Sequence, residues 1–227
     1  MEKEKLEAWT GEIKRPIRVW TNPKLKDDIY LHFSEILKQV KIYSLRFNGR
    51  ILDIGAGKTP YKKFFNYKEY ITLDNRKYKN IDIVADITKK IPLKKDSIDG
   101  VLCFQVLEHV KKPQKVIDEI YRILKPGGKC LLTTHMAAPL HGEPYDYYRF
   151  TKYGLKEIFK NFKKIEISPN GGTILSIFQL IVWGVSDKFP KFLAKPLIIL
   201  LNFIGKKLDK ILQDSRFTLN YSVYAIK

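Results

Sequence analysis

A glycine turn that follows an apolar segment is the first feature of this chain that could support chemistry. The mostly apolar segment Ile51–Ile54 runs directly into Gly55, Ala56 and Gly57. Glycine tolerates positive φ angles and lets a ligand approach the backbone closely. If Ile51–Ile54 forms a strand of an open parallel sheet, the turn lies at the carboxyl edge of that sheet, where ligands bind. The turn therefore predicts a ligand-binding site.

The residues around this turn narrow the class of ligand. A phosphate-binding Walker loop needs a glycine five residues before Gly57, and Leu52 stands there. The dinucleotide fingerprint needs a glycine three residues after Gly57, and Pro60 stands there. The turn therefore favours a nucleoside-type ligand that has no pyrophosphate.

An acidic residue closes the next apolar segment, Ile71–Leu73. In a parallel sheet, Asp74 is placed to accept hydrogen bonds from both hydroxyls of a ribose, since it follows the glycine turn by about 20 residues. Asp74 and Asn75 are also residue types that begin turns. The position alone is therefore consistent with a ribose site and with a simple turn.

Strands that alternate with helices must position these residues. A helix over Pro113–Leu124 is predicted to end at the stop signal Lys125–Gly128. Alternating units of this kind predict an α/β fold with a doubly wound parallel sheet. The candidate strands are Ile51–Ile54, Tyr70–Leu73, Ile81–Val84, Ile98–Phe104, Lys129–Thr134, Lys164–Ser168 and Phe217–Ile226.

Two regions lie outside this alternation. Leu25–Leu45 repeats apolar residues with a period near 3.6, so residues 1–49 are predicted to form a helical N-terminal extension before a domain over residues 50–227. Between the last two strands, Ile174–Ile204 holds two apolar runs divided by Pro190 and Pro196. Both runs are shorter than the ~18–20 residues that span a bilayer. We predict a helical insert over residues 174–210, built from two amphipathic helices.

Composition restricts the partners and the compartment. The 227 residues include 42 Lys and Arg against 24 Asp and Glu, a net charge of +18, which favours an anionic partner such as nucleic acid, acidic lipid or a phosphorylated substrate, or serves solubility. The two cysteines, Cys103 and Cys130, lie in apolar runs and suggest a reducing compartment. The charged N-terminus has no signal-peptide pattern. We therefore expect a cytoplasmic protein.

Several segments together resemble class I S-adenosylmethionine (AdoMet)-dependent methyltransferases of the methyltransferase type 11 group. They are DIGAGKTPY, ITLD, IVADITKKIPLKKDSIDGVLCFQVLEHV and LKPGGKCLLTTH, in the order and spacing of that family, over roughly residues 50–162. The resemblance implies a Rossmann-like sheet of seven mostly parallel strands, AdoMet as the cofactor, and methyl transfer as the reaction.

The resemblance also implies which residues hold the cofactor. Asp53, Gly55 and Gly57 would surround the methionine part, and Asp74 would bind the ribose. Other predicted contacts are made by residues at the ends of the later strands. Asp86 and Ile87 would flank the adenine, and Phe104 and Gln105 would border the sulfonium. The full predicted cofactor set is Asp53, Gly55, Ala56, Gly57, Asp74, Asn75, Asp86, Ile87, Phe104 and Gln105.

A second stretch, PYDYYRFT, is similar to one found after the fifth strand in a subgroup of these enzymes, many of which act on glycans or lipid-linked substrates. We predict that Tyr147, Tyr148 and Arg149 orient the acceptor, with Arg149 suited to an anionic group. A purely structural pairing of Asp146 with Arg149 is the alternative.

The four histidines are candidate general bases and candidate metal ligands. His141 and His109 complete the predicted catalytic set, and His135 is a further candidate for a general base. His32 is expected at the surface. Relatives that hold a metal use a Glu-x-x-Glu-His arrangement, but Gln105 replaces the first glutamate here, so no metal is predicted.

The predicted acceptor is a small molecule, a glycan or a lipid-linked compound that is methylated on oxygen or nitrogen. Lysines beside the insert suit peripheral binding to the inner face of an anionic membrane: Lys188, Lys191, Lys195, Lys206, Lys207 and Lys210. Two alternatives remain, an RNA methyltransferase favoured by the net charge and a catalytically silent methyltransferase-like protein that uses the insert as an interaction surface. The insert could also form a homodimer interface.

Overall fold

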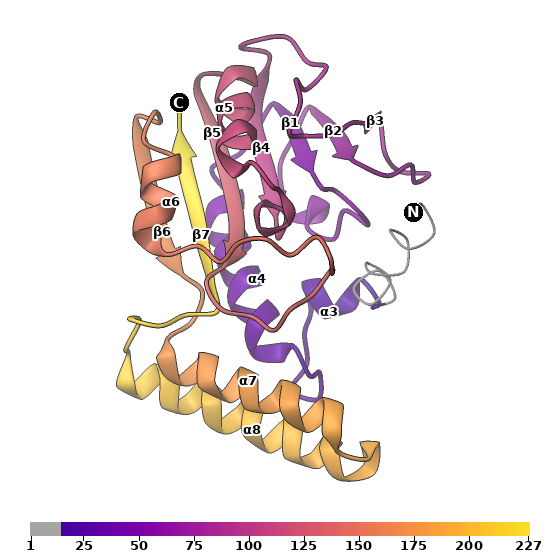
Figure 1. Ribbon diagram of the computed structural model, residues 1–227, viewed down its shortest axis with the longest axis vertical. Helices are drawn as coiled ribbons and strands as arrows, with labels where there is room; N and C mark the ends of the chain where they lie inside the picture. Colours follow the sequence, from indigo (N-terminus) through magenta and orange to yellow (C-terminus); the bar gives the residue numbers. More distant parts are fainter. Residues whose placement is uncertain (1–14) are drawn as a thin grey trace.

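A single seven-stranded sheet organises the protein in the computed structural model, which describes residues 15–227 (Figure 1). The strand order is β3-β2-β1-β4-β5-β7-β6, and β7 alone runs antiparallel to its neighbours. The predicted doubly wound, mostly parallel sheet is therefore confirmed. The strands are β1 (Arg50–Ile54), β2 (Glu69–Asp74), β3 (Ile83–Val84), β4 (Ile98–Phe104), β5 (Leu124–His135), β6 (Lys164–Pro169) and β7 (Asn220–Ile226).

The central strands are buried on both faces, which explains their almost unbroken apolar sequences. In β1 every residue after Arg50 is buried, and β4 is buried along most of its length. Three predicted strand boundaries were wrong. The strand expected over Ile81–Val84 shrinks to two residues, where the side chain of Asp82 accepts the backbone N–H of Thr72. β5 begins at Leu124, the last residue of the predicted helix, and runs through the predicted stop signal Lys125–Gly128. β7 begins at Asn220, three residues later than predicted.

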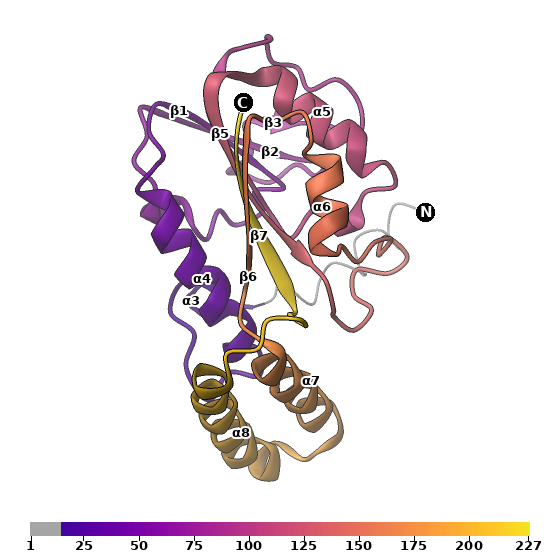
Figure 2. The ribbon, with the colours of Figure 1, turned by 90° about the vertical axis from the view of Figure 1, so that its left-hand side faces the viewer.

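Helices cover the two faces of the sheet (Figure 2). One face carries α3 (Arg18–Thr21) and α4 (Tyr30–Ser44), and the other carries α5 (Pro113–Ile123) and α6 (Lys152–Ile158). α4 starts five residues later than predicted. Its apolar face packs against Leu102 and Leu131 of the sheet, so the predicted N-terminal extension supplies a layer of the core; residues 1–14 lie outside the described residues.

The predicted insert forms a helical hairpin of α7 (Thr173–Lys188) and α8 (Lys191–Leu212) beyond the sheet (Figure 1). Pro190 separates the two helices, whereas Pro196 lies inside α8 and does not divide them as predicted. Within residues 15–227, every helix is too short or too polar to cross a membrane.

Buried amides fix the hairpin to the segment before α4. The side chain of Asn202 donates to the carbonyls of Leu25 and Asp27 at 2.7 and 3.0 Å, and that of Gln179 donates to the carbonyl of Asp28 at 2.6 Å. The Gln179 side chain also accepts the backbone N–H of His32. Because these polar groups are buried, each bond is costly to break, and the hairpin is held in one position.

The contact between α7 and α8 predicts opposite effects for two glycine substitutions. A Cβ at Gly205 would lie 2.6 Å from the Cβ of Phe178, so Gly205→Ala should lose about 1–3 kcal/mol of unfolding free energy through overpacking. A Cβ at Gly184 would meet no atom of the described residues within 4 Å, so Gly184→Ala should gain about 0.5–1 kcal/mol from helix propensity. Urea unfolding measures both changes, and equal changes would contradict this packing.

Candidate active site

The turn after β1 is shaped by a close approach to the loop after β4. Gly55 has a φ of 66°, and a Cβ there would collide with the side chain of Val106. Gly57 has a φ of 49°, and a Cβ there would make only an ordinary contact, 3.9 Å from the carbonyl oxygen of Gly55. The backbone N–H groups of Gly55 and Ala56 donate to the carbonyl of Leu73. The turn is therefore fixed on one side and open on the other, as a nucleoside cradle requires.

Asp74 lies beside this turn, at the end of β2. Its carboxylate accepts the backbone N–H groups of Gly57 and Arg76 at 3.1 and 3.0 Å. The two bonds orient both oxygens, and each oxygen keeps a lone pair for another donor. Asn75, the next residue, is exposed. A ribose beside Gly57 would find Asp74 already positioned.

Asp53 is the buried carboxyl group of the turn. It accepts a hydrogen bond from the hydroxyl of Tyr70 at 2.7 Å. Burial raises the pKa of Asp53 to about 7, against the lowering effect of that hydrogen bond. A carboxylate that is costly to ionise in this way favours a nearby cation. The ammonium and sulfonium groups of AdoMet would provide one.

The residues after β3 and β4 line the same edge. Gln105 has a φ of 56°, and its side-chain amide donates to Thr133 at 2.9 Å. Among residues 15–227, its buried side-chain oxygen has no hydrogen-bond partner, which leaves it available to a ligand donor. Phe104 packs on Tyr61. After β3, Asp86 is exposed and accepts two bonds from Thr88, and Ile87 packs on the core.

These features together fit AdoMet. The open glycine turn, the oriented Asp74 carboxylate, the buried Asp53 and the unpartnered oxygen of Gln105 all lie at the carboxyl ends of β1, β2 and β4. The individual cofactor contacts stay predictions.

The PYDYYRFT stretch forms a loop that is hydrogen-bonded to the segment after β4 and to the end of β5. Backbone N–H groups of Tyr147 and Tyr148 donate to the carbonyl of Glu108, and that of Phe150 donates to the carbonyl of His135. The Tyr148 hydroxyl donates to the carbonyl of Lys111 at 3.1 Å. The loop therefore folds back over the predicted acceptor side.

Arg149 is engaged within this loop. It contacts both oxygens of Asp146, at 2.6 and 2.7 Å, and donates to the carbonyls of Ala138 and Pro139. These bonds correspond to the structural alternative considered from the sequence. Recognition of an anionic acceptor by Arg149 stays a prediction, and the geometry gives this residue a positioning role.

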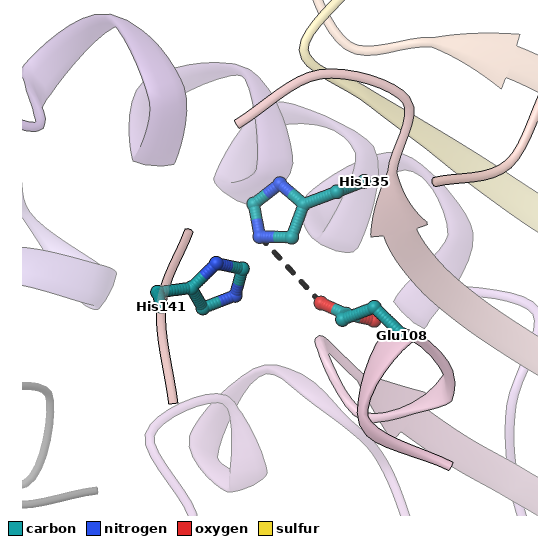
Figure 3. A group of neighbouring side chains, drawn as sticks. All are labelled: Glu108, His135 and His141. Atoms are coloured by element: carbon teal, nitrogen blue, oxygen red, sulfur yellow. Dashed lines mark ion pairs between the residues drawn. The ribbon is translucent and has the colours of Figure 1, made fainter. Parts of the chain in front are cut away.

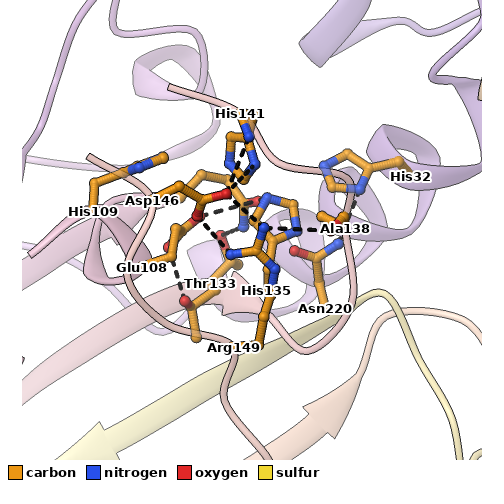
Figure 4. Close-up of polar contacts among 12 residues, drawn as sticks. His32, Glu108, His109, Thr133, His135, Ala138, His141, Asp146, Arg149 and Asn220 are labelled. Atoms are coloured by element: carbon orange, nitrogen blue, oxygen red, sulfur yellow. Dashed lines mark hydrogen bonds and ion pairs between the residues drawn. The ribbon is translucent and has the colours of Figure 1, made fainter. Parts of the chain in front are cut away.

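All four histidines of the chain meet at this loop, although they come from four separate segments. His135, at the end of β5, faces Glu108 of the short helix η2 (Leu107–His109), and His141 lies across from both (Figure 3). The ring of His141 contacts the rings of His135 and His109, with centroids 4.8 Å apart in each pair. Figure 4 shows the polar network around them.

His32 was expected at the surface, and that expectation was wrong. It is only 6% exposed, accepts or donates one bond to Asn220 at 2.9 Å, and stacks on His135. Burial lowers the pKa of His32 to about 3 and that of His109 to about 4, and it places the pKa of His135 well below its usual value. These three imidazoles are therefore neutral near pH 7.

Sequence reasoning did not find Glu108, Asp146 or Asn220 as members of one site. Glu108 and His135 close the fourth and fifth strand units, so adjacent strand ends were the signal that could have joined them. The sequence holds no comparable signal that would bring His32 and Asn220 into the same site.

Comparisons with known proteins agree with this architecture. Residues 52–132 match the family model described as a methyltransferase domain. A ubiquinone/menaquinone biosynthesis C-methyltransferase of Brucella canis is 25% identical over 154 residues, 65% of this chain and 52% of that one. The chain spans about half the length of the curated relatives it matches.

Two solved structures have the same fold. An AdoMet-dependent methyltransferase of Archaeoglobus fulgidus is 16% identical, with a TM-score of 0.56 over 87% of this chain and 94% of that one. A phosphoethanolamine N-methyltransferase of Haemonchus contortus in complex with AdoMet is 20% identical, with a TM-score of 0.52 over 94% of this chain and 60% of that one.

Residues 52–132 are therefore similar to a methyltransferase domain, and the fold is the one that these AdoMet-dependent methyltransferases share. These findings support the predicted enzyme class and the predicted cofactor, AdoMet, for the matched domain. The acceptor is not defined by these likenesses.

Asp53 predicts a measurable pH dependence of stability. Because its folded pKa of about 7 lies above its ordinary value of 3.8, the group stabilises the fold at low pH, and that contribution is lost as the pH rises through the folded pKa. The difference in unfolding free energy between Asp53→Asn and wild type should therefore shift in favour of the variant by roughly 1–3 kcal/mol from pH 5 to pH 8. Urea unfolding at the two pH values measures this gain. The same difference between the proteins at both values would refute a buried, ionisable Asp53.

Proposed function

We propose that this protein transfers a methyl group from AdoMet to an oxygen or nitrogen atom of a lipid-linked or otherwise amphipathic acceptor at an anionic membrane surface. One observation carries the proposal: an apolar hairpin edged by lysines lies at the same edge of the sheet as the glycine turn and the histidines. The hairpin leaves the sheet after Pro169 and returns at Asn220, which pairs with His135.

The chain's own residues would bind and align the reactants. AdoMet supplies the methyl group and its positive charge when bound. Asp74 would hold the ribose, and Asp53 would face the cationic end of the cofactor. The loop held by Arg149 would cover the acceptor side and exclude water, so that transfer depends mainly on alignment. Without a bound metal ion, His141 would accept a proton from the acceptor.

The exposed face of the hairpin supports contact with lipid. On α8, Phe192, Ile199 and Phe203 follow helical spacing and are 75%, 38% and 49% exposed. On α7, Ile177 and Ile181 are also exposed, at 43% and 46%. Contiguous apolar faces of this kind are unusual on a surface that meets only water. Exposed lysines border this surface: Lys188, Lys191, Lys195, Lys207 and Lys210.

The relatives add support from chemistry. The similar enzymes of Brucella canis and Lactococcus lactis are named for methylation steps that involve ubiquinone or menaquinone. Acceptors with a polar head and an apolar tail would reach an active site at a membrane surface directly. The hairpin would then both bind the membrane and border the acceptor site. It reaches that site through Trp183 of α7, whose ring contacts His32 of the histidine cluster.

Cofactor binding tests the first half of the proposal. Isothermal titration of the wild type with AdoMet should show one site per chain. Asp74→Ala should weaken binding by about 1–3 kcal/mol, because the ribose loses its acceptor and Gly57 loses its anchor. Glu69→Ala, at the exposed start of the same strand, is the control and should bind normally. A wild type that gives no heat with AdoMet or S-adenosylhomocysteine would contradict the enzyme assignment.

Flotation with lipid vesicles tests the second half. The wild type should float with vesicles that contain acidic lipid and remain below with neutral vesicles, since each lysine near an anionic surface contributes about 1 kcal/mol. Added salt should weaken binding through screening. Ile199→Asp with Phe203→Asp should abolish flotation.

The matched control is Ile42→Asp with Leu45→Asp, which places the same two charges on exposed apolar residues at the end of α4. This variant should float like the wild type. A wild type that ignores acidic vesicles and forms a dimer that the hairpin variant disrupts would instead identify the hairpin as a subunit interface.

A further inference from the structure

We propose that Glu108, His135 and His141 form a binding site for a divalent transition metal, with Zn²⁺ as the best match. This assignment departs from the prediction of no metal that Gln105 suggested from the sequence. It stands on the geometry of the three side chains, and metal binding itself does not depend on the proposed methyl transfer.

The spacing of the ligand atoms suits a small cation. One ligand atom from each of the three residues lies within 4.8 Å of the others. Oε1 of Glu108 lies 3.5 Å from Nε2 of His135, longer than a good hydrogen bond. Zinc bonds of about 2.0–2.1 Å in tetrahedral geometry place neighbouring ligands roughly 3.3–3.4 Å apart. The pair is therefore close to the separation that a shared metal ion would impose.

Burial and supporting bonds prepare these groups as ligands. Glu108 is fully buried and His135 is 5% exposed. The second oxygen of Glu108 accepts the hydroxyl of Thr134 at 2.8 Å, which orients the carboxylate. Nδ1 of His141 lies 3.1 Å from the carbonyl of Pro139, and its Nε2 is buried with no hydrogen-bond partner within residues 15–227. Such outer contacts are typical of metal-binding histidines and carboxylates.

Local charge also favours a cation. Arg149 and Asp146 neutralise each other through their paired contacts. The carboxylate of Glu108 lies in a buried place, where charged groups are normally paired or coordinate metals. A second group, formed by His109, His141 and Asp146, has similar spacing. Its carboxylate is already held by Arg149, so Glu108 is the better ligand.

Two histidines and one carboxylate leave a coordination position open, as in catalytic zinc sites. This position would take water or an oxygen atom of the acceptor. That role, unlike metal binding, rests on the proposed methyl transfer, and it narrows the acceptor to one with a metal-binding oxygen near the methylated atom.

The test uses the full chain after dialysis against a chelator, titrated with ZnCl₂ by calorimetry and with CoCl₂ by visible absorption. We expect one tight site per chain and intense tetrahedral cobalt bands. Glu108→Gln and His135→Gln should each weaken binding by about 100-fold or more through loss of a ligand. His32→Gln is the control, since His32 stacks on His135 but lies outside the ligand set, and it should bind within about tenfold of wild type.

AdoMet titration of each variant separates this proposal from the proposed function. A folded Glu108→Gln protein that binds AdoMet normally but no metal supports the site. No zinc or cobalt binding by the wild type would overturn it. Loss of metal binding in Asp146→Asn but not in Glu108→Gln or His135→Gln would overturn the ligand assignment and place the ion at the second group.

Discussion

The close approach of the turn after β1 to the loop after β4 is the constraint on which the rest of the site depends. A side chain at Gly55 would collide with Val106, so these two loops can meet only through a glycine. Val106 immediately precedes η2, which carries Glu108 and His109. The contact that shapes the cofactor turn therefore also fixes the start of the histidine cluster. The residues predicted to bind the cofactor and the acceptor are held by one rigid frame, which is what reactions controlled by alignment need.

Much of this frame could be predicted from the sequence because it follows local rules. The buried parallel strands are apolar over their whole length, and β4 was predicted with its observed ends. The glycine turn and Asp74 lie at strand ends whose relative position is set by the fold class. The hairpin was also predictable, because two apolar runs that meet at Pro190 can form two helices but cannot span a membrane.

The histidine cluster could not be predicted in the same way. His32 looks like a surface residue in an amphipathic helix, and it is buried only because α7 and the start of β7 pack against it. The predicted role of Arg149 in binding an anion is likewise modified by Asp146, whose carboxylate engages it through a turn that local sequence does not specify. Contacts between distant segments decide these polar groups, and periodicity does not encode them.

The hairpin and the candidate active site lie at the same edge of the sheet. The hairpin of α7 and α8 lies at the end of the sheet where the parallel strands β1, β4 and β5 finish (Figures 1 and 2). The predicted cofactor turn follows β1, and His135 ends β5 at the same edge. The most direct test of this arrangement is a crystal structure of the protein with S-adenosylhomocysteine. The account predicts the ribose hydroxyls on Asp74 and the sulfur directed toward His141. A cofactor bound elsewhere, or a sulfur directed away from the histidines, would contradict it.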